Sequence, residues 1–223
     1  MVEQRVTWLT PPRTEREELL DRPDHAPEDF ARSYADIRRI NRWLGGVSVV
    51  RRELRRLGVP AKATVLDVAT GAGDIPAALG SPAVGLDLNP SALAVARDVR
   101  GLRLVRGDAR SLPFRDGSFD VVTCSLTFHH FPDAEAAEIL REMHRVARRA
   151  VVVNDLRRAW LPAGLIWMVT RTLRMHPMTR HDAPVSVLRS RTPAEYRALC
   201  SDAGFAGEVR SHPFWRASLV VPK

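Results

Sequence analysis

The feature of this sequence that most constrains its fold is a short apolar run that ends in a turn of small residues. Residues 64–69 are apolar and β-rich apart from Asp67, and Gly71 and Gly73 follow at once. A continuous apolar run of this length is typical of a parallel strand buried on both faces. The glycines allow a sharp turn and leave room for a ligand against the backbone. The stretch therefore predicts a strand, a ligand-binding turn and a helix, in that order.

Two further predicted strands also end in an acid. Residues 83–88 contain Asp87 near their end, and residues 102–107 are followed by Asp108. An acid at the end of the second strand of such a sheet is placed to accept hydrogen bonds from both hydroxyls of a ribose. A carboxylate at the end of the third strand can accept a hydrogen bond from the amino group of an adenine. The three acids together predict a ligand that contains adenosine.

The glycine spacing narrows the choice of adenosine ligand. A dinucleotide fingerprint needs a third glycine where this chain has Pro76, so the pyrophosphate signature fails. A phosphate-binding loop is also absent from the sequence, because no lysine follows the glycines. S-adenosylmethionine has ribose and adenine but no phosphate, and it is the cofactor that we predict.

These residues resemble the first motif of the class I S-adenosylmethionine-dependent methyltransferases, Asp/Glu-x-Gly-x-Gly-x-Gly. Asp67, Gly71 and Gly73 match it, and Ala69 stands where the first glycine usually is; a residue this small should be tolerated. The resemblance covers residues 64–156 and extends to the type 11 small-molecule branch, which includes enzymes of ubiquinone and menaquinone biosynthesis. It implies an α/β fold with a Rossmann-like seven-stranded sheet in the order 3-2-1-4-5-7-6.

The resemblance also implies roles for the cofactor-binding residues. Asp67 orients the methionine amino group, Asp87 holds the ribose and Asp108 faces the adenine. The full predicted set of cofactor-binding residues is Asp67, Ala69, Gly71, Gly73, Asp87, Leu88, Asp108, Ala109 and Ser125.

The candidate catalytic residues follow the fourth predicted strand, residues 119–126, which normally lies beside the first at the ligand-binding edge. His129 and His130 stand there. Methyl transfer to a hydroxyl needs an aligned acceptor and a base, and histidine has a reference pKa of about 6.5. A nearby sulfonium should favour the neutral, basic imidazole. We predict that one of the two is the base, with His129 favoured; the alternative is that both are structural.

Asp155 is the third predicted catalytic residue. It follows the fifth predicted strand, residues 150–153, at the same edge, where it could orient a histidine. The alternative is a helix cap or a salt bridge to a nearby arginine. We expect no metal, because a set made of His129, His130 and Asp133 lacks a second carboxylate cluster.

The chain outside these motifs divides into a helical cap, residues 1–60, and a methyltransferase domain, residues 61–223. Within the cap, residues 28–57 have helical periodicity broken at Gly45, while residues 1–27 are expected to be loosely ordered apart from a short helix over 15–20. Tyr34 is either a lid contact to the cofactor or substrate, or part of an apolar stripe.

Residues 160–178 are unusually rich in tryptophan, methionine and leucine. We expect either an apolar lid over an aromatic acceptor or ordinary core, with binding to a membrane surface as a minor third possibility. His181 and Asp182 fall in a predicted loop, and His181 is a second candidate for contact with substrate. A helix over 192–203 and strands over 208–211 and 215–221 complete the domain.

Composition bears on partners and location. The formal net charge of +8 raises nucleic acid as a partner, but the arginines are dispersed through helices, so we expect a solvated basic surface and no nucleic acid. The sequence lacks an apolar run of about 18 residues and a signal-peptide pattern, which predicts no membrane insertion and a cytoplasmic protein. Cys124 and Cys200 are too few for a disulfide framework.

The sequence as a whole predicts an enzyme that methylates a small apolar or aromatic acceptor. The favoured reaction is O-methylation of a phenolic or polyketide-like hydroxyl, as in secondary metabolism. C-methylation of a quinone precursor is the first alternative, since a ring carbon ortho to a phenol needs the same deprotonation. Methylation of RNA and a non-catalytic cofactor-binding role are the others.

Overall fold

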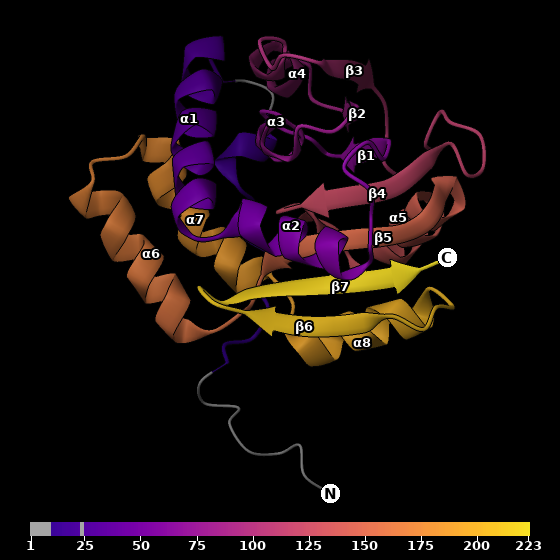
Figure 1. Cartoon of the computed structure of the whole chain (residues 1–223). Helices are drawn as coiled ribbons and strands as arrows, with labels where there is room; N and C mark the ends of the chain where they lie inside the picture. Colours follow the sequence, from indigo (N-terminus) through magenta and orange to yellow (C-terminus); the bar gives the residue numbers. More distant parts are fainter. Residues whose placement is uncertain (1–9, 23–24) are drawn as a thin grey trace, which may run out of the picture.

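The computed structural model describes residues 10–22 and 25–223, which form a sheet with helices on both faces (Figure 1). The strands are β1 (Val65–Val68), β2 (Ala83–Asp87), β3 (Leu102–Arg106), β4 (Phe119–Ser125), β5 (Ala147–Leu156), β6 (Glu208–His212) and β7 (Arg216–Pro222). The helices are α1 (Pro27–Trp43), α2 (Gly46–Arg56), α3 (Asp74–Leu79), α4 (Pro90–Ala96), α5 (Asp133–Val146), α6 (Trp160–Thr172), α7 (Pro177–Arg189) and α8 (Pro193–Asp202). Two 3-10 turns, η2 (Leu19–Asp21) and η3 (Phe128–His130), complete the fold.

The seven strands follow the order β3-β2-β1-β4-β5-β7-β6, which confirms the predicted topology. β1 lies between β2 and β4 and pairs in parallel with both, and only β7 runs antiparallel to its neighbours β5 and β6. All four residues of β1 are buried, as the continuous apolar run predicted. The carboxyl ends of β1, β2 and β4 therefore meet at one edge of the sheet.

Helices cover both faces of the sheet. The main core packs α5 and α8 against one face, with Leu140 and Met143 of α5 fully buried against strand residues such as Val151. α2 and α3 cover the other face, where Val50 and Ile75 pack against the sheet. The apolar stripes of these helices match the sheet faces that they bury.

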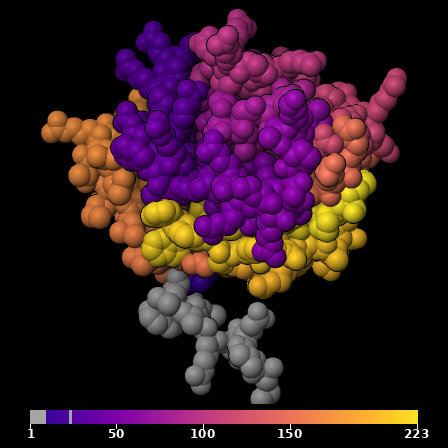
Figure 2. Space-filling model, in the orientation of Figure 1, coloured from indigo at the N-terminus to yellow at the C-terminus, as the bar shows by residue number. Residues whose placement is uncertain are grey.

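The helical cap begins with α1 and α2, which are separated at Gly45, where φ is +76°. The break was predicted. In Figure 2 the indigo and violet atoms of the cap lie directly beside the magenta atoms of the α3–α4 region. The cap is thus packed onto the sheet domain, and the two parts share a continuous surface.

The segment before α1 differs from its prediction. Residues 10–22, which we call the N-terminal strap, lie against α7: Thr14 N–H donates to the Leu188 carbonyl, and Asp182 accepts the N–H groups of Leu19 and Leu20. The predicted loose order is therefore wrong for the strap, and the predicted short helix is replaced by η2. Residues 1–9 and 23–24 lie outside the described residues. The residues that the strap contacts are distant from it in sequence, so no local pattern predicts these contacts.

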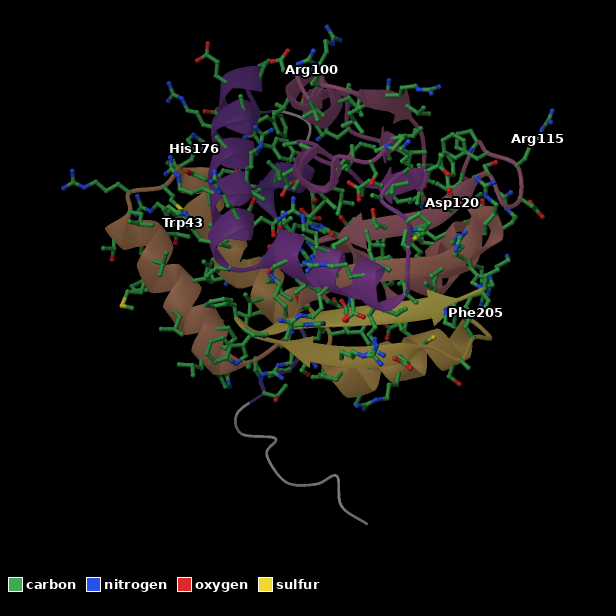
Figure 3. The ribbon with its side chains drawn as sticks, in the orientation of Figure 1. Trp43, Arg100, Arg115, Asp120, His176 and Phe205 are labelled. Carbon is green, nitrogen blue, oxygen red and sulfur yellow. The ribbon has the colours of Figure 1, made fainter. Side chains whose placement is uncertain are left out.

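The segment 160–178 forms α6 and the start of α7. Ala163 and Ile166 pack against Val187 of α7, while the outer face of α6 is exposed: Trp160, Leu161, Leu165, Trp167, Met168 and Val169. Trp43, at the end of α1, is also exposed, and His176 sits beside α1, paired with Asp29 (Figure 3). Among the described residues, no helix is both long and apolar enough to span a bilayer.

The predicted loop at residues 181–182 is also wrong, because His181 and Asp182 lie within α7. The helix carries Pro184 in its interior, and an interior proline normally ends or kinks a helix. Contacts with α6 and the strap stabilise α7 despite this residue.

Burial predicts a large difference between two leucine truncations. Leu140→Ala removes a fully buried side chain between α5 and the sheet, and should lower the free energy of unfolding by about 2–5 kcal/mol. Leu165→Ala, on the exposed face of α6, should change it by less than about 1 kcal/mol. Urea unfolding of both variants measures the difference; equal losses would contradict this assignment of the core.

Candidate functional site

The glycine turn begins with a buried carboxylate. Asp67, at 2% exposure, accepts hydrogen bonds from the Thr70 hydroxyl at 2.8 Å and the Thr123 hydroxyl at 2.6 Å. Burial raises the pKa of Asp67 to about 7, although both hydroxyls oppose the shift. A carboxyl group in this position can change its charge when a cation, such as an ammonium group, arrives.

The backbone of the turn explains its small residues. Ala69, Gly71 and Gly73 all have positive φ, at +53°, +53° and +72°. An L-residue with a side chain is strained in this region, which accounts for the glycine that related motifs carry at the position of Ala69. A Cβ atom on Gly73 would lie 2.8 Å from Leu102 Cδ2. Ala69 is accommodated here, but in a left-handed conformation.

Asp87 joins the end of β2 to this turn. Its Oδ2 accepts the Gly71 N–H at 2.9 Å, and its Oδ1 accepts the Asn89 N–H at 2.9 Å. Burial raises the pKa of Asp87, while these N–H groups and the nearby His130 oppose the rise. The structure thus brings together Asp87 and Gly71, two residues predicted to bind one cofactor.

The other predicted cofactor residues are more loosely placed. Asp108 is partly exposed and engaged by Arg110, whose guanidinium lowers the pKa of the carboxyl group. Leu88 is exposed beside Asp87, and Ala109 packs against the core. Ser125 Oγ accepts a hydrogen bond from the Asn154 amide at 3.3 Å. Their roles in cofactor binding stay predictions.

The cap helix α1 covers the glycine turn. Tyr34 lies so close to Gly71 that a Cβ atom there would be 3.4 Å from the tyrosine ring, and Arg38 donates to the Ala72 carbonyl at 3.0 Å. Burial raises the pKa of Tyr34, and the carboxylates of Asp87 and the strap residue Asp21 add to the rise. Tyr34 thus lies against the glycine turn, and its contact with the cofactor or substrate stays a prediction.

His129 is held between two carboxylates. Its Nδ1 lies 2.8 Å from Asp155 Oδ1, and its backbone N–H donates to Asp155 Oδ2 at 3.1 Å. On the other side, Nε2 lies 3.3 Å from Oε1 of Glu18. Burial alone would lower the pKa of His129, but the carboxylates of Asp155 and Glu18 raise it to about 10. In the protein without ligands, this environment favours the imidazolium over the neutral base that the sequence suggested.

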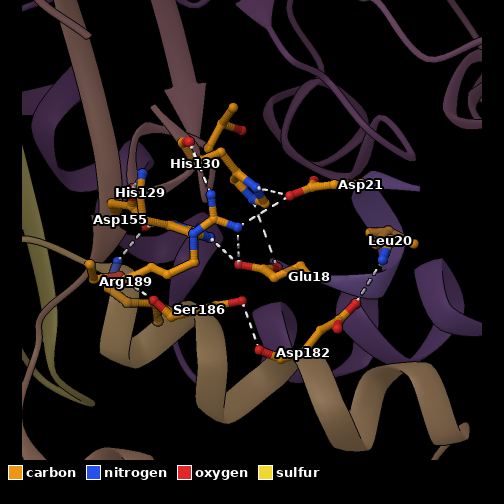
Figure 4. Close-up of polar contacts among 12 residues, drawn as sticks. Glu18, Leu20, Asp21, His129, His130, Asp155, Asp182, Ser186 and Arg189 are labelled. Carbon is orange, nitrogen blue, oxygen red and sulfur yellow. Dashed lines mark hydrogen bonds and ion pairs between the residues drawn. The ribbon is translucent and has the colours of Figure 1, made fainter. Parts of the chain in front are cut away.

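His130 stands beside it with more access to solvent. The two rings are 4.3 Å apart, and the His130 side chain is 20% exposed. Its Nδ1 lies 2.9 Å from Asp21 Oδ2, and its Nε2 lies 3.8 Å from Glu18 Oε2. Figure 4 shows the strap carboxylates turned toward His130 and Arg189. The histidine pair is thus enclosed by a segment that precedes the methyltransferase core.

The sequence analysis missed three members of this cluster: Glu18, Asp21 and Arg189. Arg189 pairs with Asp21 at 3.2 Å and donates to the His130 carbonyl at 3.0 Å. Nothing in the spacing of these residues links them to His129. Asp133, the carboxylate weighed as a metal ligand, instead pairs with Arg13 and Arg191, so that set of ligands does not form.

Comparisons with known proteins agree with this geometry. A family model described as "Methyltransferase domain" matches residues 66–153. A demethylmenaquinone methyltransferase of Deinococcus radiodurans is 33% identical over 179 residues, which cover 70% of this chain and 73% of that protein. The chain belongs to the class I S-adenosylmethionine-dependent methyltransferases. S-adenosylmethionine is therefore its cofactor.

Two further similarities define the extent of this family relationship. A demethylmenaquinone methyltransferase of Thermus thermophilus is 45% identical over 92 residues, so the match spans 37% of this chain and only 41% of that relative. A solved S-adenosylmethionine-dependent methyltransferase from Aquifex aeolicus superposes with a TM-score of 0.63 at 16% identity, over 89% of this methyltransferase and 99% of that chain. The second similarity shows a shared fold.

The strain at Ala69 predicts opposite effects for two alanine-to-glycine variants. Ala69→Gly relieves a left-handed alanine and should leave stability unchanged or raise it by up to about 1 kcal/mol. Ala72→Gly, outside the left-handed region in the same turn, should lower stability by about 0.5–1 kcal/mol. Urea unfolding measures both, and a larger loss in Ala69→Gly than in Ala72→Gly would refute the assignment of strain.

The pKa of Asp67 predicts proton release on cofactor binding. If its carboxylate binds the methionine ammonium, binding lowers the pKa from about 7, so affinity should rise as pH increases from about 5.5 to 7. The rise should approach about tenfold per pH unit at the acidic end. Calorimetry in two buffers of different ionisation enthalpy measures the released proton. The dependence should vanish in Asp67→Asn; if it persists, another group is responsible.

Proposed function

We propose that this protein transfers the methyl group of S-adenosylmethionine to a ring carbon ortho to a hydroxyl, in an aromatic quinone precursor with an apolar substituent. The observation that carries the proposal is the carboxylate-supported histidine pair, which follows the strand next to the glycine turn. An acceptor that must lose a hydroxyl proton suits this pair, because the imidazolium of His129 would stabilise the oxyanion and His130, which is 20% exposed, would take up the proton. The names of the Deinococcus and Thermus relatives support a quinone precursor as its class.

The proposed reaction is an in-line displacement at the sulfonium methyl group. Transfer of the hydroxyl proton to His130 would make the ortho carbon nucleophilic; a C–C bond then forms as the C–S bond breaks, and S-adenosylhomocysteine leaves. The ring proton passes to solvent water, which restores aromaticity, and the proton on His130 returns to the phenolate oxygen. Asp87 and the glycine turn hold the donor. His129, His130 and Asp155 are the proposed catalytic group, and Asp155 and Asp21 fix the orientation of the two imidazoles.

O-methylation of the same hydroxyl is the second candidate. The histidine cluster is as compatible with O-methylation as with C-methylation, because deprotonation of the hydroxyl yields an oxygen nucleophile as well as a carbon nucleophile. The position of the ring relative to the methyl group decides between them. Both reactions need the same cofactor and the same acceptor class, so one assay separates them by product.

Nucleic acid is not the acceptor that we propose, and three of the arginines are used inside the fold. Arg191 and Arg216 are almost fully buried, and Arg158 is 6% exposed. Arg191 pairs with Asp133, Arg158 pairs with Glu195, and Arg216 donates to the Leu44 carbonyl. Their charges stabilise internal contacts and do not form a surface for phosphates.

The test is methyl transfer from S-adenosylmethionine with a deuterated methyl group to alkylated dihydroxynaphthalenes and alkylphenols. Tandem mass spectrometry locates the label on carbon or oxygen. We expect C-methylation of the dihydroxynaphthalene, and a drop in kcat of about 100-fold or more in Asp155→Asn, which loses the partner of His129.

Asp116→Asn is the matched control for that variant. It makes the same change at a carboxylate that is 81% exposed, and it should keep full activity. Cofactor binding and thermal unfolding of Asp155→Asn separate lost chemistry from lost structure. The proposal would be refuted if no methyl group is transferred to any of these acceptors, or if a folded Asp155→Asn keeps full activity.

A further inference from the structure

The cluster around the histidine pair contains a set of ligand atoms that the proposed reaction does not fully use. Glu18 comes from the N-terminal strap, and His129 and His130 come from η3 after β4. One ligand atom from each of the three lies within 4.8 Å of the other two. Glu18 and His129 are buried, and His130 is partly buried. Two imidazoles and one carboxylate thus converge from segments far apart in the sequence.

The two imidazoles are oriented alike. Each turns Nε2 toward the Glu18 carboxylate, at 3.3 Å for His129 and 3.8 Å for His130. Each has its Nδ1 on a second carboxylate, Asp155 at 2.8 Å and Asp21 at 2.9 Å. Histidines that bind metals almost always donate their other ring N–H to a carboxylate or carbonyl, which fixes the tautomer with a free Nε2 lone pair. Both histidines meet this requirement (Figure 4).

Two buried atoms in the centre of the cluster face each other. Glu18 Oε1 and His129 Nε2 lie 3.3 Å apart on side chains that are only 5% and 2% exposed, and among the described residues neither atom has another hydrogen-bond partner. Their separation of 3.3 Å equals the edge of a tetrahedron, about 3.3 Å, for metal–ligand bonds of about 2.0–2.1 Å. The geometry suits one ion bound by both atoms.

The charge of the cluster points the same way. The carboxylates of Glu18, Asp21 and Asp155 outnumber the two cationic groups beside them, the His129 imidazolium and the guanidinium of Arg189, which contacts Asp21 at 3.2 Å and lies 3.8 Å from Glu18. Burying an excess of negative charge is costly unless a cation offsets it. A divalent cation would offset this excess and would replace the proton between His129 and Glu18.

We propose that Glu18, His129 and His130 bind one divalent first-row transition ion of the zinc or cobalt type. Imidazole nitrogen with a carboxylate suits such ions, whereas magnesium and calcium prefer sites made of oxygen atoms. Three protein ligands leave a coordination position open, as in catalytic zinc sites. The ion ties the N-terminal strap to the turn after β4.

The open position gives the ion a second role, which rests on the proposed function. A hydroxyl oxygen of the acceptor would bind there, and the cation would lower the pKa of that hydroxyl. The hydroxyl proton then leaves to solvent water, and His129 and His130 act as ligands in place of proton acceptors. Chelation of the ion would slow transfer without preventing cofactor binding.

Metal binding is tested on the full chain without an affinity tag, stripped with EDTA and desalted. Calorimetric titration with zinc chloride and cobalt chloride should give one equivalent bound, and magnesium chloride should bind far more weakly. The cobalt complex should show visible absorption typical of a low-coordinate site. Zinc should also raise the thermal unfolding temperature, because it binds the folded state.

Two variants and one control assign the site. Glu18→Gln and His130→Asn should each weaken zinc binding by at least about 10–100-fold, the loss that even second-shell changes produce. His144→Asn removes a histidine from α5, outside the cluster, and should bind zinc as the unchanged protein does. Thermal unfolding confirms that each variant is folded. If Glu18→Gln destabilises the fold, His130→Asn, at a position that is 20% exposed, decides.

The outcomes separate this inference from the proposed function, because binding is measured with neither cofactor nor acceptor present. Absence of a stoichiometric ion, or equal affinity in a folded His130→Asn, overturns the site and leaves a proton between His129 and Glu18. If no ion binds and the proposed function is correct, methyl transfer should continue in the presence of EDTA. An ion that binds as expected, in a protein that methylates none of the acceptors, supports the site and refutes the proposed function.

Discussion

The parallel pairing of β1 with β2 and β4 is the constraint on which the site depends. It brings three carboxyl ends to one edge, where Thr123 of β4 donates to Asp67 of β1 and where Asp87, at the end of β2, receives the Gly71 N–H. A slip of one residue would turn every side chain of β1 to the opposite face. That slip would also take Asp67 away from the Thr70 and Thr123 hydroxyls and leave a buried carboxyl group without partners, so the register of β1 and the geometry of the cofactor turn are set together.

The N-terminal strap depends in turn on the histidines that it covers. Glu18 is buried with its carboxylate toward His129 and His130, and Asp21 is held by His130 and Arg189. Removing one partner of a buried ionic group costs about 3–5 kcal/mol, because the other is left uncompensated. The strap and the turn after β4 therefore stabilise each other, which couples closure of the site to the residues proposed to act in it.

Local patterns explain which parts of the fold and site could be predicted. The strands, α5 and α8 follow from periodicity and capping residues, and the Asp67-to-Gly73 turn follows from short-range spacing. The pair of His129 with Asp155 was predictable because Asp155 lies near the end of β5 and His129 lies in the turn that follows β4, the neighbouring parallel strand. By contrast, α7 carries an interior proline, and the strap has no periodicity of its own, so both were misjudged.

The sequence by itself determined the sheet and the kind of cofactor, because each depends on residues close together in the chain whose spacing reflects backbone geometry. Only the tertiary structure decided that His129 lies between Asp155 and Glu18, that Tyr34 covers Gly71, and that α6 turns its apolar face outward. These contacts join segments separated by 26 to 111 residues or depend on how whole helices pack. Such separations leave no period or spacing in the sequence, because chain folding alone brings the partners together.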